Sequence, residues 1–133
     1  MRGKLAAALI LCCAVVALCG CGPKNSGASD LVLTLDDTNF DDEIAEGVVL
    51  VDFWAPWCGP CRQQGPIVED VAGQVGDNAK VAKLNVDDAP EAAQRFGVRS
   101  IPTIIIFTDG EPGKRFVGVT SADALVSAIE DAQ

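Results

Sequence analysis

The sequence predicts a single α/β domain over residues 31–133, in which a central mixed β-sheet is flanked by helices on both faces. One observation is the order of the apolar patterns along these 103 residues, which alternates strand and helix and ends in a β–β–α unit. The other is the pair of nearly continuous apolar runs at residues 48–54 and 103–108, typical of strands that are buried on both faces. A chain of 133 residues is about one domain's worth.

Each element has its own local signal. The strands are expected at residues 31–35, 48–54, 81–86, 103–108 and 115–119, and the helices at residues 38–46, 58–75, 90–96 and 121–132. Thr38 and Ser121 are placed to cap their helices, and Pro90 suits a first helical turn. We expect the helix over 58–75 to be interrupted at Gly65–Pro66. Asp109–Gly110 predicts a hairpin turn, with the loop continuing through residue 113.

The composition excludes several classes of function. The chain has 10 basic and 19 acidic residues and a net charge of -9, which argues against a nucleic-acid binder, since such proteins need a basic surface. Histidine is absent, so no Ser-His-Asp triad, Cys-His dyad or histidine metal site can form within the chain. The six cysteines are therefore the most informative residues, four of them before residue 22 and two at Cys58 and Cys61.

The N-terminus has the layout of a secretory signal peptide. Arg2 and Lys4 precede an uncharged, apolar stretch at residues 5–19, which is short for a membrane span. The stretch ends in Leu-Cys-Gly-Cys at residues 18–21, which resembles the lipobox of bacterial lipoproteins and implies lipidation of Cys21 after removal of residues 1–20. Small polar residues then predict a flexible tether through residue 30. The alternative is an uncleaved anchor helix.

The charge of the mature chain indicates how the protein would be attached to the membrane. Without Arg2 and Lys4 the mature chain carries a net charge of -11, so it is not attracted to anionic lipid and acyl chains must hold it at the membrane. The expected location is extracytoplasmic, in the bacterial cell envelope.

Cys58 and Cys61 form a Cys-x-x-Cys motif between a buried strand and a helix, which is typical of a dithiol redox site. The first cysteine stands at a helix N-terminus, where free N–H groups favour a thiolate, the nucleophile of disulfide exchange. Two alternatives are a structural disulfide and a zinc site. The first would close too short a loop to stabilise the fold much, and the second needs four ligands where only two free thiols remain, so no metal is expected.

Residues 31–133 resemble the thioredoxin family along their whole length. Five blocks match in order and spacing: VDFWA at 51–55, WCGPC at 57–61, VAKLNVD at 81–87, GVRSIPT at 97–103 and VG at 117–118. The resemblance implies the thioredoxin fold and protein disulfide oxidoreductase activity, with Cys58 as the nucleophile and Cys61 as the resolving cysteine. It implies no bound cofactor, because the cysteine pair is itself the redox group, and a monomer that acts on protein disulfides.

Asp52 is an acid within an otherwise apolar strand, and burial should raise its pKa. The resemblance makes Asp52 the proton acceptor for Cys61, through water, and matches Lys83 to the lysine near this acid. The alternatives are a solvent-facing acid at a strand end and a solvated lysine.

The family also keeps a cis proline against the cysteine pair, here Pro102. The resemblance implies that the backbone of Ile101 pairs with an extended substrate segment and that Trp57, Ile101 and Gly118 line the docking groove, together with the Gly59–Pro60 pair between the cysteines. Trp54 is assigned to the core. Residues 62–65 are more polar than is usual before the helix proline, Pro66, a departure that concerns the choice of partner.

The sequence favours a membrane-tethered reductant of disulfides in extracytoplasmic proteins, supplied with electrons by a membrane thiol-transfer protein. Alternatives are a disulfide donor or isomerase, and a reductant for cytochrome c maturation. Gly59–Pro60 argues against the latter, whose members usually carry an acidic residue between the cysteines. A further alternative is a non-catalytic binding module.

Overall fold

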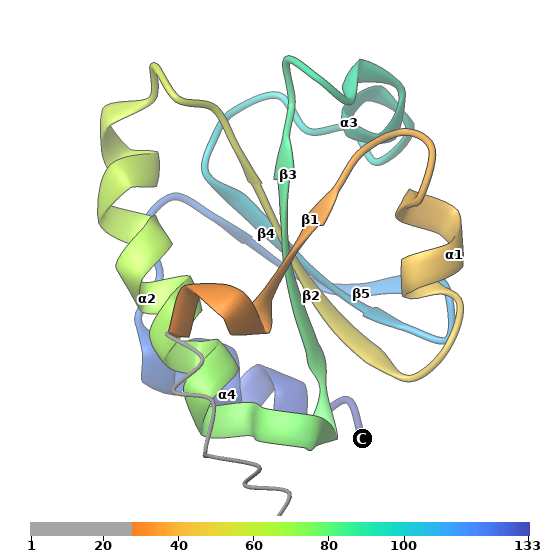
Figure 1. Ribbon diagram of the computed structural model, residues 1–133, viewed down its shortest axis with the longest axis vertical. Coiled ribbons are helices and arrows are strands. Elements are labelled where there is room, and N and C mark those ends of the chain that lie inside the picture. The colour runs from red at the N-terminus through yellow and green to blue at the C-terminus, as the bar shows by residue number, and fades with distance from the viewer. Residues whose placement is uncertain (1–27) are drawn as a thin grey trace, which may run out of the picture.

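The computed structural model describes residues 28–133 (Figure 1). The predicted signal peptide, Cys21 and residues 22–27 of the predicted tether lie outside this range. Residues 28–30 of that tether belong to a 3-10 helix, η1 (Ala28–Leu31), which packs against helix α2. Within residues 28–133, no helix is long and apolar enough to cross a membrane.

A five-stranded mixed sheet forms the centre of the domain, in the order β1-β3-β2-β4-β5. The first three strands in this order run parallel, β4 runs antiparallel to β2, and β5 runs antiparallel to β4. The strands are β1 (Val32–Leu35), β2 (Val48–Trp54), β3 (Lys80–Asn85), β4 (Thr103–Thr108) and β5 (Glu111–Val117). The predicted α/β class with a mixed sheet is confirmed.

Helices cover both faces of this sheet, as the sequence predicts (Figure 1). Helices α1 (Phe40–Ile44) and α3 (Pro90–Arg95) pack on one face. Helices α2 (Gly59–Val75) and α4 (Ala122–Glu130) pack on the other, and the short 3-10 helix η2 (Gly76–Asn78) follows α2. The Cys-x-x-Cys motif at the start of α2 is therefore fixed on a helix that rests against the sheet.

Strand β2 divides its side chains between the two cores. Val49 and Phe53 face the core under α1 and α3, whereas Val48 and Leu50 face the core under α2 and α4. Alternation along a strand places Asp52 on the same face as Leu50, beneath α2. The sheet thus carries an acid into the layer that also holds the helix of the two cysteines.

Two predictions are wrong: the last strand does not begin at residue 115, and the helix over residues 58–75 is not interrupted at Gly65–Pro66. Strand β5 begins at Glu111, directly after Asp109 and Gly110, which both have positive φ as a tight two-residue turn requires. Pro112 is tolerated because β5 is an edge strand, and the register shifts beside it. Helix α2 continues through Pro66, because the buried residues beyond it hold the helix on the sheet.

The first helix is shorter than predicted, and Thr38 does not cap it. The N–H and the hydroxyl of Thr38 both donate to the carboxylate of Asp36, which forms a local turn. The helix then begins at Phe40, with Asn39 at its N-cap position. Ser121 does cap α4, through a hydrogen bond from the N–H of Ala124.

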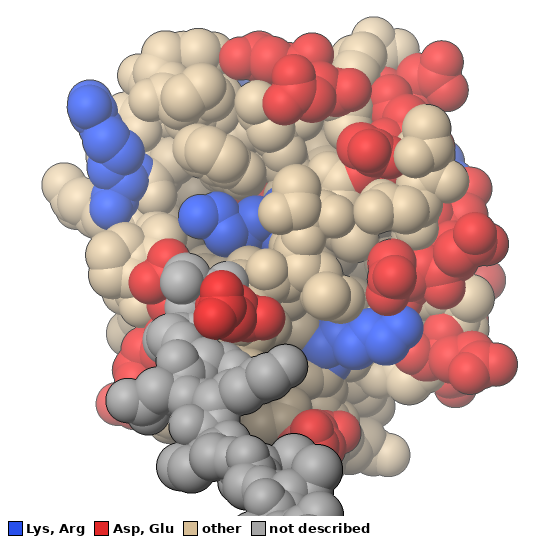
Figure 2. Space-filling model, in the orientation of Figure 1, with Lys and Arg blue, Asp and Glu red and all other residues tan. Residues whose placement is uncertain are grey.

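Acidic side chains gather on the side of the molecule formed by α1 and α3 (Figure 2). Asp37, Asp41 and Glu91 are exposed there, and Arg95 forms an ion pair with Asp41 at 2.6 Å. An exposed ion pair of this kind contributes only about 0–1 kcal/mol to stability. Part of the excess of acidic residues therefore forms a negatively charged surface on this side of the domain.

Candidate active site

The turn between β2 and α2 brings Cys58 and Cys61 together as a disulfide, with 5.3 Å between their Cα atoms. Cys58 has extended backbone and is the N-cap residue of α2, and Cys61 lies in the first turn of the helix. Both are nearly buried, at 5% and 3% exposure, and Cys58 is the more exposed of the two. The structure therefore places the two cysteines as the motif predicts, at a helix N-terminus.

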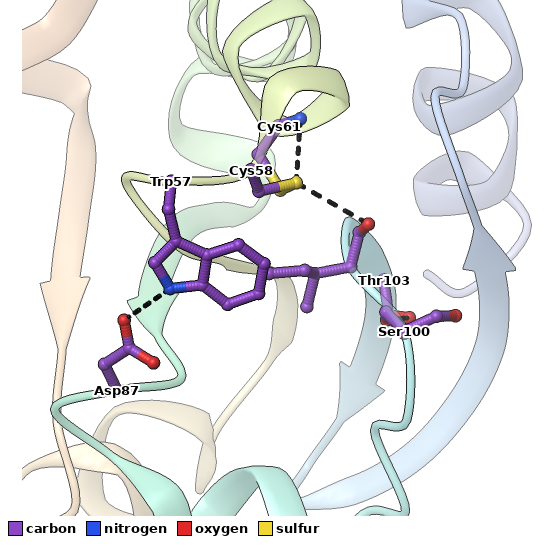
Figure 3. Close-up of a disulfide and its surroundings, with 7 residues drawn as sticks. Trp57, Cys58, Cys61, Asp87, Ser100 and Thr103 are labelled. Carbon is purple, nitrogen blue, oxygen red and sulfur yellow. Dashed lines mark hydrogen bonds between the residues drawn. A yellow bond between two sulfur atoms is a disulfide. The ribbon is translucent and has the colours of Figure 1, made fainter.

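Two backbone groups face the sulfur of Cys58 (Figure 3). The N–H of Cys61 donates to Cys58 Sγ at 3.2 Å, and the carbonyl oxygen of Ile101 lies 3.6 Å from the same atom. In the dithiol state the first contact and the helix dipole favour the Cys58 thiolate. Gly59 has no side-chain donor and Pro60 has no N–H, so neither intervening residue adds a second donor.

Asp52 is fully buried, and neither of its carboxyl oxygens has a hydrogen-bond partner within residues 28–133. Burial raises the pKa of Asp52 from its ordinary value of 3.8 to about 7, because removal from water penalises the charged form. The alternative of a solvent-facing acid at a strand end is therefore wrong. A carboxyl with a pKa near neutrality can exchange a proton at physiological pH, so its predicted role is chemically available.

Lys83 lies beside Asp52 in the sheet, since these two residues are register partners in the parallel pair of β2 and β3. Its positive charge lowers the pKa of Asp52 and partly offsets the effect of burial. The ammonium group also stands 4.8 Å from the ring centroid of Trp54. Lys83 is only half-buried, so its ammonium group is partly solvated and also lies against the indole of Trp54.

A groove of about 480 Å³ runs beside Cys58. Most of the predicted docking residues line this groove together with Cys58, namely Trp57, Gly59, Pro60 and Ile101. Four lining residues were not predicted from the sequence: Val86, Val98, Arg99 and Ser100. The groove is an open surface directly beside the sulfur of Cys58, where the resemblance places the docking of an extended segment.

The cis bond implied by the resemblance is present between Ile101 and Pro102. Pro102 is buried, and its carbonyl oxygen accepts a hydrogen bond from the N–H of Gly118 at 2.8 Å. Gly118 therefore adjoins the groove through Pro102, and neither residue lines the groove itself. Trp57 is 66% exposed, whereas Trp54 is half-buried and packs against the cluster of Ala55, Cys58 and Cys61, so its assignment to the core holds only in part.

Two polar contacts at the site were missed by the sequence analysis. The indole N–H of Trp57 donates to Asp87 at 2.8 Å (Figure 3), and this contact orients the exposed ring that lines the groove. Asp87 belongs to the matching block at residues 81–87, but no sequence pattern predicts its contact with Trp57. The second contact joins the buried side chain of Gln64 to the backbone of Thr120.

The fold and the paired cysteines together define a protein disulfide oxidoreductase whose redox group is its own Cys58–Cys61 pair. Comparison with known proteins gives the family: residues 31–131 match the Thioredoxin family model. The chain is 48% identical over 99 residues to a thioredoxin of Staphylococcus saprophyticus, with 74% of this chain and 95% of that protein covered. It is 44% identical over 98 residues to a thioredoxin of Bacillus subtilis, covering 74% and 94%. The chain belongs to the thioredoxin family.

A solved structure agrees with this assignment. A mutant thioredoxin from Halobacterium salinarum is similar with a TM-score of 0.70 and 42% sequence identity, over 75% of this chain and 88% of that one. The family model starts at residue 31, so the first 30 residues stand outside the family domain.

Proposed function

We propose that this protein is a lipid-anchored reductant of disulfides in extracytoplasmic proteins. The observation that carries the proposal is the segment before the family domain, which ends in Leu-Cys-Gly-Cys at residues 18–21, ahead of a domain with a Cys58–Cys61 redox pair. The staphylococcal and Bacillus relatives match over nearly their whole length, whereas about a quarter of this chain falls outside the match. In this proposal the N-terminal segment directs and anchors the protein, and the domain supplies the activity.

The reaction is a two-electron disulfide exchange. The Cys58 thiolate attacks one sulfur of a client disulfide, forms an intermolecular disulfide and releases the first client thiolate. Cys61 then gives its proton, through water, to the carboxylate of Asp52 and attacks the Cys58 sulfur, which releases the second client thiolate. The client gains two electrons and the protein is left as the Cys58–Cys61 disulfide.

The N-terminal side of the domain lies at the opposite end of α2 from the two cysteines. Asp30 and Leu31 share a pocket with Ala72 and Gly76, at the C-terminal end of α2, whereas Cys58 caps the N-terminal end (Figure 1). A helix of 17 residues is about 25 Å long at 1.5 Å per residue. A flexible tether that joins the domain at this end would leave the active site free to face away from the membrane.

The proposed direction of electron flow is argued from the contacts of Cys58 Sγ, which the structure holds in the disulfide. Among residues 28–133, the N–H donor to Cys58 Sγ is that of Cys61 alone. Weak stabilisation of the thiolate makes the dithiol less stable and the pair more reducing. A membrane thiol-transfer protein would re-reduce it, because the site lies outside the cytoplasm.

The proposal is tested on the full chain in a bacterial host. We expect a clickable palmitate analogue to label the parent, the parent to sediment with membranes, and thiol trapping to find Cys58 and Cys61 mostly as the dithiol. Cys21→Ala should accumulate as unprocessed, unlabelled precursor, whereas Cys13→Ala, a cysteine within the predicted signal peptide, should behave as the parent. Normal processing of Cys21→Ala would overturn the anchor, and a fully oxidised pair would overturn the reductant role.

A further inference from the structure

We propose that Gln64 is a positioning residue for client docking, which holds the segment from Gly118 to Thr120 in place beside the groove. This inference rests on the proposed reduction of protein clients, and it adds a residue to which neither the motif nor the resemblance assigns a role. Its basis is a two-point hydrogen bond between a fully buried carboxamide and the backbone of a loop residue.

The carboxamide of Gln64 matches both backbone groups of Thr120. Its Oε1 accepts from the N–H of Thr120 at 2.7 Å, and its Nε2 donates to the carbonyl oxygen of Thr120 at 3.1 Å. Only one orientation of the amide satisfies both groups, so the pair is fixed in geometry. Gln64 lies in α2, one turn after Cys61, so the bond links the helix of the redox pair to the connection between β5 and α4.

Further hydrogen bonds carry this link to the docking site. The hydroxyl of Thr120 donates to the carbonyl oxygen of Gly118 at 3.1 Å, and the N–H of Gly118 donates to the carbonyl oxygen of Pro102 at 2.8 Å. Pro102 follows Ile101, whose carbonyl oxygen faces Cys58 Sγ. A continuous path of contacts thus joins Gln64 to the residue on which the client strand would pair.

Gln64 adds a restraint from α2 to a loop that is otherwise held by the hydrogen bonds of Gly118 and the hydroxyl of Thr120. Gly118 has a φ of +89°, outside the range of a strand, and Val117 and Val119 on either side of it are exposed. An apolar side chain at position 64 would leave the N–H and C=O of Thr120 without their partner. The loop would then become ordered only when a client binds, and the free energy spent on ordering it would weaken docking. Disulfide exchange at the sulfur of Cys58 would be unchanged.

Gln64→Met is the informative variant, because it keeps the size of the side chain and removes both hydrogen bonds. Gln63→Met is the matched control, since Gln63 is the adjacent residue of the same helix and is exposed. The substrates are insulin, which must dock, and hydroxyethyl disulfide, a linear disulfide that is too small to span the groove. Each variant is assayed as the detergent-solubilised full chain.

We expect Gln64→Met to raise KM for insulin about three- to tenfold, as the loss of one to two net hydrogen bonds predicts, with kcat changed less than about twofold. Its rate with hydroxyethyl disulfide and its reduction potential should equal those of the parent, and Gln63→Met should match the parent in every assay. Equal KM values for insulin in the two variants would overturn the positioning role. So would a loss of rate with both substrates, because that result places Gln64 in the chemistry.

Failure of the parent to reduce insulin would instead count against the proposed function. A measurement on the parent alone keeps the test decisive if Gln64→Met does not fold. The backbone amide of Thr120 should exchange with deuterium at least about tenfold more slowly than an unprotected loop amide, since each 1.4 kcal/mol of protection is a factor of ten. An unprotected Thr120 amide would overturn the proposal.

Discussion

Replacement of Asp52 by asparagine should make the protein more stable at neutral pH and slower in catalysis. The side chain keeps its shape but loses its charge, and Asp52 is buried without a hydrogen-bond partner for either carboxyl oxygen among the described residues. The folded state holds the proton of Asp52 more tightly than the unfolded chain, because burial raises its pKa. The stability due to this group is therefore full below pH 3.8, falls as the pH rises towards 7, and stays low above 7.

The magnitude follows from the size of the shift. A rise of the pKa from 3.8 to about 7 corresponds to roughly 4 kcal/mol between the two protonation states, at 1.36 kcal/mol per unit. Asparagine is still a buried polar group, and leaving it without a partner costs about 1–3 kcal/mol. We therefore expect Asp52→Asn to gain about 1–3 kcal/mol of unfolding free energy at pH 8 and to gain nothing, or to lose stability, at pH 4.

Urea unfolding of the oxidised protein, followed by fluorescence from pH 4 to 8, measures this difference directly. The oxidised form is used because its cysteines do not titrate. Asp70→Asn is the control, since it makes the same substitution at an exposed acid on α2 and should not reproduce the gain in stability of Asp52→Asn at pH 8. A difference between Asp52→Asn and the parent that is the same at every pH would refute the buried-acid argument.

The catalytic effect has its own pH dependence. Above pH 7 the parent has the Asp52 carboxylate to accept the proton of Cys61, and the variant has none. We expect insulin reduction by Asp52→Asn to be slower by about tenfold or more at pH 8, at the low end of what a positioned base contributes. The ratio of the two rates should approach one as the pH falls below 7, where the parent's acid is protonated.

Three further predictions concern the same site. Lys83→Met removes the charge that lowers the pKa of Asp52, so the midpoint of the stability profile should move to higher pH in the same urea titration. Cys61→Ser should accumulate mixed disulfides with client proteins on non-reducing gels, whereas Cys58→Ser should trap almost none, and the reverse pattern would contradict the assignment of nucleophile. Equilibration with glutathione buffers should leave the pair mostly as the disulfide at a mildly oxidising ratio. A pair that stays mostly dithiol there would mark a disulfide donor.

The fold could be predicted from the sequence because its strands carry a strong local signal. The apolar runs of β2 and β4 have few alternatives to a doubly buried strand, and the intervening helices have clear periodicity. The errors occurred where long-range contacts decide the structure. Pro112 and Gly113 resemble a loop locally, but pairing with β4 extends the edge strand through both of them. The Pro66 position looks like a break in a helix, yet packing on the sheet carries α2 past it.

The reactive part of the site could likewise be predicted, because its chemistry is encoded by rare residues. Two cysteines at fixed spacing and one acid in an apolar strand are unusual in any sequence, and the structure puts the cysteines together and buries the acid. The groove depends on residues of no special type. Val98 and Ser100 line the groove because of the path of the backbone before Pro102, and the types of these two side chains do not predict that path.

Gln63 and Gln64 show most clearly what sequence alone leaves undecided. The two residues are identical and adjacent, and both make the start of α2 more polar than is usual in the family. The helix turns about 100° between them, so Gln63 meets solvent and Gln64 points into the protein, where a polar group must find partners. It finds them on Thr120, which is 56 residues away in the chain. The polar residue at position 64, which differs from the usual family sequence, therefore makes an internal contact and does not alter the surface. Any effect of Gln64 on client binding should act through the loop that contains Thr120.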